Sequence, residues 1–404
     1  MTKRSSAGLS MVLKNFCRVA PHPWIGVKLA KLEMAKRFFN VLNPRRATGH
    51  AGKIRQASFR ITDLCNLRCH TCGQWGDSGF LHNQNLKQLK SSEVTPTRYR
   101  EVFTDLVHHG HQPVVYFWGG EPMLYDGLLD VIDDAAKLGL PPSIATNGTR
   151  LAAAAARLVA APLFLLQVSI DGHTASLHNQ LRPSAGIGDN FRDINLGLDA
   201  IRTARTKRGH GLPVIAALTV VSQANRHHLV DIYEAFRDKV DLFVFYLSWW
   251  IDTENAATHE QDFSRRFGFC PTKHRGWIGD WKSTDHELLA SQFAELQARS
   301  RPLSAPAVSI IPPIAGCANL KTYYTDHRAT FGFNQCVSIY QVVEINSNGD
   351  VSPCRDYHDY VVGNIKTATL TELWNGPAYQ KFRQSLHRDG LMPACRRCCG
   401  LMGY

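Results

Sequence analysis

Short apolar runs alternate with amphipathic stretches along most of the chain from residue 57 onward. The apolar runs are rich in Val, Ile and aromatic residues, which is the pattern of buried strands. We expect such strands at 58–62, 113–118, 142–147, 165–170, 213–221 and 242–250. The stretches between them place apolar residues at helical spacing. They predict helices near 97–109, 125–138, 150–160, 190–207 and 225–238.

Strands that alternate with helices form parallel β/α units joined by right-handed crossovers. Six such units are fewer than the eight that close a TIM barrel. We therefore predict an α/β fold in which residues 57–250 form a partial (β/α)6, TIM-like barrel.

The pattern changes after residue 250. Residues 251–335 have mixed content with one clear helix at 285–300, and they predict a connector that is placed to line an active site. From residue 336 two alternating strands flank "NSNGD", whose Asn-Gly pair is typical of a hairpin turn. A helix near 369–386 and a cysteine-rich tail follow, so we predict a small C-terminal hairpin and helix domain over 336–404.

The composition predicts a soluble protein in a reducing compartment. The 404 residues are 44% hydrophobic and 20% charged, which is ordinary for a globular protein of two or three units. The most apolar stretch is interrupted by Arg157 and Pro162, and the start of the chain has no unbroken apolar signal region. The 11 cysteines are clustered, which favours metal ligation over disulfides. We expect a cytoplasmic protein.

Charge is concentrated in an N-terminal arm, residues 1–56. The first 57 residues hold 12 Lys or Arg against a single acid, Glu33, whereas the rest of the chain has 34 bases and 33 acids. Such an arm is a candidate for contact with nucleic acid, an anionic membrane surface or another anionic partner. The alternative is an arm that packs on the body of the protein with its lysines in solvent.

Candidate chemistry follows each predicted strand. Active sites of parallel β/α folds collect beyond the carboxyl ends of the strands. In chain order these ends carry "DLCNLRCHTC", "GGEP", "NGT", "DG", "SQAN" and "WWID". Six such ends in register predict one site at the barrel mouth.

The segment "CNLRCHTC", together with "GGEP" after the next strand, resembles the radical S-adenosylmethionine (SAM) enzymes over roughly residues 57–250. The resemblance implies that Cys65, Cys69 and Cys72 hold three irons of a [4Fe–4S] cluster and that SAM binds the fourth iron. It also implies that reductive cleavage of SAM yields a 5′-deoxyadenosyl radical, which takes a hydrogen atom from the substrate. The alternative is a zinc site, which three cysteines without a nearby fourth ligand make poorly, although His70 could complete it.

The SAM contacts implied by the resemblance lie on three strand ends. Glycines let backbone approach the methionine part of SAM, and a carboxylate is a partner for its ammonium group. The third and fourth strands offer polar groups, those of the fourth for the ribose hydroxyls. The candidates are Gly119, Gly120, Glu121, Asn147, Ser169 and Asp171.

One position departs from the family pattern. The residue before the third cysteine is commonly aromatic and lies near adenine, whereas this chain has Thr71. Adenine contacts are therefore expected elsewhere.

The tail resembles the twitch, or truncated SPASM, extension of radical SAM enzymes. By that resemblance Cys336, Cys354, Cys395 and Cys398 ligate one auxiliary [4Fe–4S] cluster. Cys399 is an alternative to Cys398, and the sequence leaves that choice open. A zinc ribbon made of four cysteines is the other interpretation. Few residues follow Cys399, so we expect one auxiliary cluster and not two.

Five further residues are candidates for catalysis. Cys270 and Cys317 lie in the connector, where a thiol could return a hydrogen atom to a substrate radical. Asp252 follows the sixth strand, and Tyr357 and His358 stand beside a predicted cluster ligand as candidate acid, base or anchor. The alternative for Tyr357 and His358 is packing around the cluster.

The expected function is oxidation of a small molecule or a peptide side chain, with the auxiliary cluster as electron acceptor. Epimerisation or cross-linking during peptide maturation is an alternative. From another class, a non-catalytic iron–sulfur or nucleic-acid-binding protein is the remaining alternative. An enzyme of this kind needs an electron donor such as flavodoxin or ferredoxin.

Overall fold

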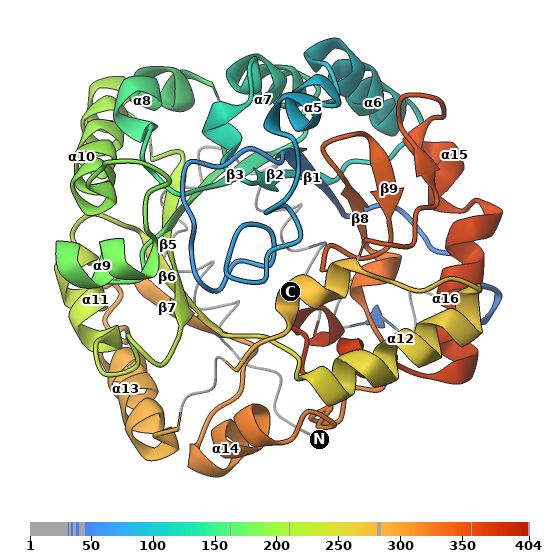
Figure 1. Cartoon of the computed structure of the whole chain (residues 1–404). Helices are drawn as coiled ribbons and strands as arrows, with labels where there is room; N and C mark the ends of the chain where they lie inside the picture. The colour runs from blue at the N-terminus through green and yellow to red at the C-terminus, as the bar shows by residue number, and fades with distance from the viewer. Residues whose placement is uncertain are drawn as a thin grey trace.

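A curved ten-stranded sheet forms the centre of the molecule (Figure 1). The computed structural model describes residues 31, 34, 38–39, 45–161, 163–209, 211–280, 284–356 and 358–402. The strand order is β10-β9-β8-β1-β2-β3-β4-β5-β6-β7. The strands are β1 (Gln56–Thr62), β2 (Val114–Gly119), β3 (Pro142–Thr146), β4 (Leu165–Ser169), β5 (Val214–Val221), β6 (Leu242–Leu247), β7 (Ala307–Ile311), β8 (Val342–Ile345), β9 (Asp350–Ser352) and β10 (Gly363–Asn364).

Helices surround this sheet on its outer side (Figure 1). The predicted helix at 369–386 is divided in two, because Gly376 and Pro377 interrupt it and a proline cannot continue a helix. The α-helices are α5 (Leu86–Ser91), α6 (Pro96–His108), α7 (Leu128–Lys137), α8 (Leu151–Ala160), α9 (Ala175–Leu181), α10 (Asn190–Arg208), α11 (Leu229–Phe236), α12 (Thr253–Phe267), α13 (His286–Arg299), α14 (Cys317–Thr325), α15 (Leu370–Trp374) and α16 (Pro377–Asp389).

Alternation along the strands divides the core in two. Residues such as Phe117 and Phe243 belong to the large apolar core that includes the helices. Residues at the alternate positions, such as Ala216 and Val244, form a smaller apolar cluster of their own. Because neighbouring strand residues point to opposite faces, the second cluster marks the inner face of the barrel.

The sheet extends further than the six strands expected from the sequence. Strand β7, within the predicted connector, pairs in parallel with β6. Strand β8 pairs in parallel with β1, and β9 and β10 follow in antiparallel pairing. The C-terminal hairpin therefore continues the barrel sheet, and it covers the backbone groups that β1 would otherwise expose at an edge. The division of the chain at residues 57, 251 and 336 remains a proposal.

The end of the basic arm packs on the C-terminal helices. Most of residues 1–44, and with them most of the arm, lie outside the described residues. The indole N–H of Trp374 donates to the carbonyl of Gly52 at 2.7 Å, and Asn375 exchanges two hydrogen bonds with Ala51. Among the described residues, no helix has the length and hydropathy needed to cross a membrane.

Arg383 joins these parts. Its side chain is fully buried, and its guanidinium carbon lies 4.2 Å from the ring centre of Trp374 and 3.9 Å from that of Tyr379. It donates to the carbonyls of Ile339 at 2.8 Å and Gly49 at 3.1 Å. One buried cation therefore binds the segment before β1 to α15 and α16.

Replacing Arg383 with Met should lower the free energy of unfolding by about 2–4 kcal/mol, because it leaves buried carbonyl groups without donors. Urea denaturation of the unaltered and variant proteins checks this. Arg388→Met is the matched control, since Arg388 lies on the same helix with 75% of its side chain exposed. Equal loss in both variants would contradict the role given to Arg383.

Candidate active site

The three cysteines of "CNLRCHTC" lie on the loop that follows β1, which crosses the open end of the barrel in Figure 1. The backbone N–H of Cys72 donates to the carbonyl of Cys69 at 3.1 Å, so the loop turns back on itself there. Cys65 Sγ accepts a hydrogen bond from the N–H of Leu67 and Cys72 Sγ accepts one from Trp75, both at 3.4 Å. These N–H groups stabilise thiolates, as the predicted ligands of a metal cluster require.

The pKa shifts of the loop cysteines also suit a bound iron–sulfur cluster. Burial, together with neighbouring thiolates of the triad, raises the pKa of Cys65 to about 12 and that of Cys69 to about 11, although Arg182 acts to lower the pKa of Cys69. Cys65 and Cys69 therefore ionise together only if a strong positive charge is added. Bound iron supplies that charge, so the donor set suits a [4Fe–4S] cluster with three protein ligands.

Arg182 stands beside this triad. It follows the last residue of α9, and its Nη1 lies 3.6 Å from Cys69 Sγ. Its Nε donates to Asp171 Oδ2 at 2.6 Å, and the N–H of Val220 donates to Asp171 Oδ1 at 2.8 Å. Asp171, a predicted ribose contact, thus holds a cation against Cys69. The sequence signal for Arg182 was weak, because nothing in "LHNQLR" indicates which acid the arginine meets.

The glycines of "GGEP" let β2 approach the cysteine loop. A Cβ atom on Gly119 would lie 2.3 Å from the carbonyl oxygen of Thr62, and one on Gly120 would lie 2.2 Å from that of Leu64. The N–H groups of Gly120 and Glu121 donate to these two carbonyls at 2.8 and 2.7 Å. The structure therefore shows these glycines in contact with the start of the cysteine loop. Their contact with SAM stays a prediction.

Glu121 connects β2 to β3. Its carboxylate is buried and accepts hydrogen bonds from Thr146 Oγ1 at 2.6 Å, from the N–H of Met123 at 3.0 Å and from the N–H of Asn147 at 2.7 Å. Burial raises its pKa, whereas these hydrogen bonds lower it. The carboxylate oxygens together offer about four lone-pair positions, and these donors occupy three of them.

Asn147 binds the cysteine loop directly. Its Nδ2 donates to Asn66 Oδ1 at 2.8 Å, and Asn66 Nδ2 donates to Thr149 Oγ1 at 3.0 Å. Asn66 lies between two residues of the triad segment, and sequence reasoning missed it. The predicted residue Ser169 ends β4 and has a half-buried side chain.

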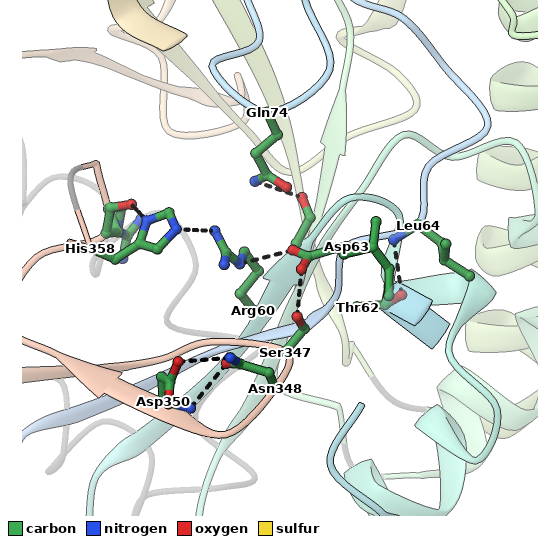
Figure 2. A network of polar contacts seen from close by, with 12 residues as sticks. Arg60, Thr62, Asp63, Leu64, Gln74, Ser347, Asn348, Asp350 and His358 are labelled. Carbon is green, nitrogen blue, oxygen red and sulfur yellow. Dashed lines mark hydrogen bonds and ion pairs between the residues drawn. The ribbon is translucent and has the colours of Figure 1, made fainter. Parts of the chain in front are cut away.

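The C-terminal hairpin reaches the same loop (Figure 2). Asp63, the first residue after β1, forms an ion pair with Arg60 at 3.0 Å and accepts a hydrogen bond from Ser347 Oγ at 2.6 Å. His358 Nε2 lies 3.1 Å from Arg60 Nη1. Burial and the charge of Arg60 hold the pKa of His358 well below its ordinary value, so this imidazole is a neutral acceptor. Tyr357 lies outside the described residues.

The tail cysteines gather in the C-terminal domain. Cys336, Cys354, Cys395 and Cys398 all belong to, or pack against, the main apolar core, whereas Cys399 packs against the inner cluster of the barrel. Burial and the nearby Cys395 raise the pKa of Cys336 to about 12. The N–H of Gly400 donates to Cys398 Sγ at 3.3 Å, as expected beside a bound thiolate. Cys398 is the predicted fourth ligand, and Cys399, which also raises the pKa of Cys336, stays the alternative.

In the part of the chain that the structure describes, Asp252, Cys270 and Cys317 form no hydrogen bond or ion pair with the cysteine loop. Asp252 caps α12 by accepting a hydrogen bond from the N–H of Asn255 at 2.7 Å. Cys270 is exposed, and Cys317 begins α14, which packs on the outer helix α13 (Figure 1).

Part of the inner face of the barrel is polar. Arg355 pairs with Glu344 at 2.9 Å and lies 5.2 Å from the ring centre of Trp118, yet 36% of its side chain remains exposed. A group of buried polar atoms on neighbouring strands has no hydrogen-bond partner among the described residues. The group comprises Trp118 Nε1, Ser143 Oγ, Gln167 Oε1 and Glu344 Oε2. Buried polar groups are normally paired, so these atoms are suited to meet a bound molecule.

Comparison with protein families agrees with this geometry. Residues 59–236 match the model of the radical SAM superfamily, and residues 336–399 match SPASM, an iron–sulfur cluster-binding domain. Pre-heme d1 synthase of Dinoroseobacter shibae is 26% identical, and the match covers 79% of this chain and 72% of the relative. The cysteine-type anaerobic sulfatase-maturating enzyme of Clostridium novyi is 23% identical, with 83% and 84% covered.

Solved structures show the same fold. Native anSMEcpe with bound AdoMet and Cp18Cys peptide has a TM-score of 0.55 and 17% identity, and the match covers 82% of each chain. Streptococcus suis SuiB bound to precursor peptide SuiA has a TM-score of 0.54 and 14% identity, with 88% of this chain and 70% of SuiB covered. The predicted α/β partial barrel is confirmed.

Replacing Arg182 with Gln should leave the iron content unchanged and make reduction of the cysteine-loop cluster harder, because a positive charge beside an anionic centre is lost. We expect a more negative midpoint potential in a redox titration followed by EPR, and SAM cleavage about tenfold slower. Arg192→Gln, at an exposed position on α10, is the matched control. An unchanged potential would show that Arg182 only packs against the loop.

Proposed function

Because the chain belongs to the radical SAM superfamily and carries a SPASM domain, we propose that it is an oxidoreductase that removes a hydrogen atom from its substrate and then oxidises the substrate radical. The radical SAM domain binds a [4Fe–4S] cluster and SAM, which together supply a 5′-deoxyadenosyl radical, and the SPASM domain binds auxiliary iron–sulfur clusters. The observation that carries the proposal is the gathering of three cysteines on one loop over the polar part of the barrel interior.

In this proposal the residues of the barrel mouth hold and orient the cofactors. Cys65, Cys69 and Cys72 are the three ligands, and Arg182, whose Nη1 lies 3.6 Å from Cys69 Sγ, offsets their negative charge. Glu121 keeps a lone pair for the ammonium group of SAM while its other contacts hold β2 to β3. These groups are fixed before SAM binds, so little reorganisation is needed.

The substrate is proposed to lie on the inner face of the barrel. There Trp118 supplies an aromatic surface and an N–H donor, and Gln167 supplies an acceptor. Arg355, half exposed beside Glu344, is available to a further polar group. The loop after β1 covers this space, and exclusion of water protects a reactive radical.

The tail cysteines make oxidation the favoured outcome. We assign Cys336, Cys354, Cys395 and Cys398 to one auxiliary cluster. The substrate would lose one hydrogen atom, then one electron to this site and one proton, a two-electron oxidation in total. Epimerisation needs a hydrogen donor at the site, and the positions of Cys270 and Cys317 argue against that alternative.

The substrate class is a small molecule or a peptide side chain. Relatives with similar coverage include a pre-heme d1 synthase and an enzyme that matures sulfatases, and SuiB has been solved with a precursor peptide. A peptide cross-linking reaction is therefore the second candidate.

Removal of the three loop cysteines tests the proposal. Cys65→Ala/Cys69→Ala/Cys72→Ala should reduce formation of 5′-deoxyadenosine from SAM and dithionite by about a hundredfold or more, since three ligands are lost together. Cys270→Ala, which removes an exposed thiol, should retain the activity. The proposal is wrong if the triple variant cleaves SAM as well as the unaltered protein does.

An electron donor is proposed to dock beside Cys65. A groove of about 480 Å³ there is lined by Leu64, Cys65, Leu86, Lys87, Lys90 and Ser91. Lys366 extends the positive charge, because its ammonium group donates to the carbonyl of Ser92 at 2.6 Å. The exposed side chains of Lys87 and Lys366 suit an acidic flavodoxin or ferredoxin, whereas Lys90 is already paired with Glu93 and Asp126.

Replacing Lys87 with Glu should slow SAM cleavage driven by reduced flavodoxin about tenfold and leave cleavage driven by dithionite unchanged. Lys87 is exposed at the start of α5, where an acid is compatible with the helix. Lys137→Glu, at an exposed site on α7, is the control. Equal flavodoxin rates for both variants would place the docking surface elsewhere.

A further inference from the structure

Three metal-ligating side chains lie together outside the cysteine loop. His173 follows β4, and His228 and Asp231 stand at the start of α11, after β5. One ligand atom from each lies within 4.8 Å of the other two. His228 Nδ1 is 2.8 Å from Asp231 Oδ2, and the ring centres of the two histidines are 4.8 Å apart. Two imidazoles and a carboxylate are a donor set typical of zinc.

His173 supplies a second, independent observation. Its Nδ1 atom is buried and has no hydrogen-bond partner in the part of the chain that the structure describes. A buried polar atom without a partner normally costs stability, so such atoms usually face a water molecule, an ion or a ligand. An imidazole nitrogen that carries no proton can donate its lone pair to a metal ion.

The two loops are already held in place. Asn225 is fully buried, and its Nδ2 donates to the carbonyl of Asp171 at 3.0 Å and to that of Val220 at 2.9 Å. Its Oδ1 accepts from the N–H of Ser222 at 2.8 Å, and the N–H of His228 donates to the carbonyl of Asn225 at 2.8 Å. One side chain thus fixes the backbone beside both histidines.

Gly172 fixes the other loop. A Cβ atom there would lie 2.5 Å from the backbone nitrogen of His178, so the turn before His173 packs closely on α9. Thr174, the next residue, caps that helix by accepting from the N–H of Leu177. The position of His173 is therefore set by short local contacts, as in a preformed metal site.

We propose that His173, His228 and Asp231 bind one divalent transition-metal ion, with zinc as the best match, at the rim of the barrel mouth. Water completes the four-coordinate shell that zinc prefers. Binding would join the loop after β4 to the start of α11 and so brace the backbone of Asp171. The site contains no cysteine and does not depend on the proposed SAM chemistry.

Zinc content tests the site. The protein is purified without a histidine tag, both sets of cysteines are loaded with iron–sulfur clusters, and the sample is dialysed against buffered Zn²⁺ and then metal-free buffer. Elemental analysis should find about one zinc per chain in the unaltered protein and almost none in His173→Ala/His228→Ala. His227→Ala, the exposed neighbour, should keep its zinc. Equal zinc in the double variant and the unaltered protein would overturn the proposal.

A milder variant covers the case in which the double variant does not fold. Asp231 is exposed, so Asp231→Asn should fold normally. It should bind Zn²⁺ about tenfold or more weakly in a titration of the cluster-loaded protein. Zinc should also raise the thermal midpoint of the unaltered protein more than that of Asp231→Asn. An unchanged affinity would remove the carboxylate from the site and overturn the three-ligand assignment.

Discussion

Three cysteine side chains on one loop require a fixed backbone and a source of positive charge, and the surrounding structure meets both needs. The end of β2 supports the loop through the close approach of Gly119 and Gly120, and β3 holds it through Asn147. Beyond β4, Asp171 holds Arg182 against Cys69. Neighbouring parallel strands thus act on one loop because their carboxyl ends lie at the same edge of the sheet.

The C-terminal domain also supports the cysteine loop. Because β8 pairs with β1, the hairpin that precedes Cys354 is in register with the strand that leads to Cys65. Contacts from Ser347 to Asp63 and from His358 to Arg60 continue this connection at the mouth (Figure 2). The two groups of cysteines therefore lie on elements that are joined by strand pairing and side-chain contacts.

Local patterns predicted the elements of the fold and the cysteine loop, whereas long-range pairing was beyond them. The alternation of strands and helices predicted β1 to β6, but β7 lay in a stretch of mixed content and β8 was assigned to a separate domain. The resemblance of the cysteine segment to radical SAM enzymes predicts Cys65, Cys69 and Cys72 as cluster ligands. It did not identify Arg182 or Asn66, because a partner distant in sequence leaves no periodic signal. Asp252, which caps α12, and Cys317, which begins α14, stay predictions.

The central claim is that the loop cluster keeps one coordination position for SAM. The most direct test uses a Cys336→Ala/Cys354→Ala variant, in which the loop cluster alone should remain. EPR spectra of the reduced protein are recorded with and without SAM. The account predicts a changed spectrum when SAM is added, because SAM becomes a ligand of the cluster. A spectrum that is the same with and without SAM would contradict it.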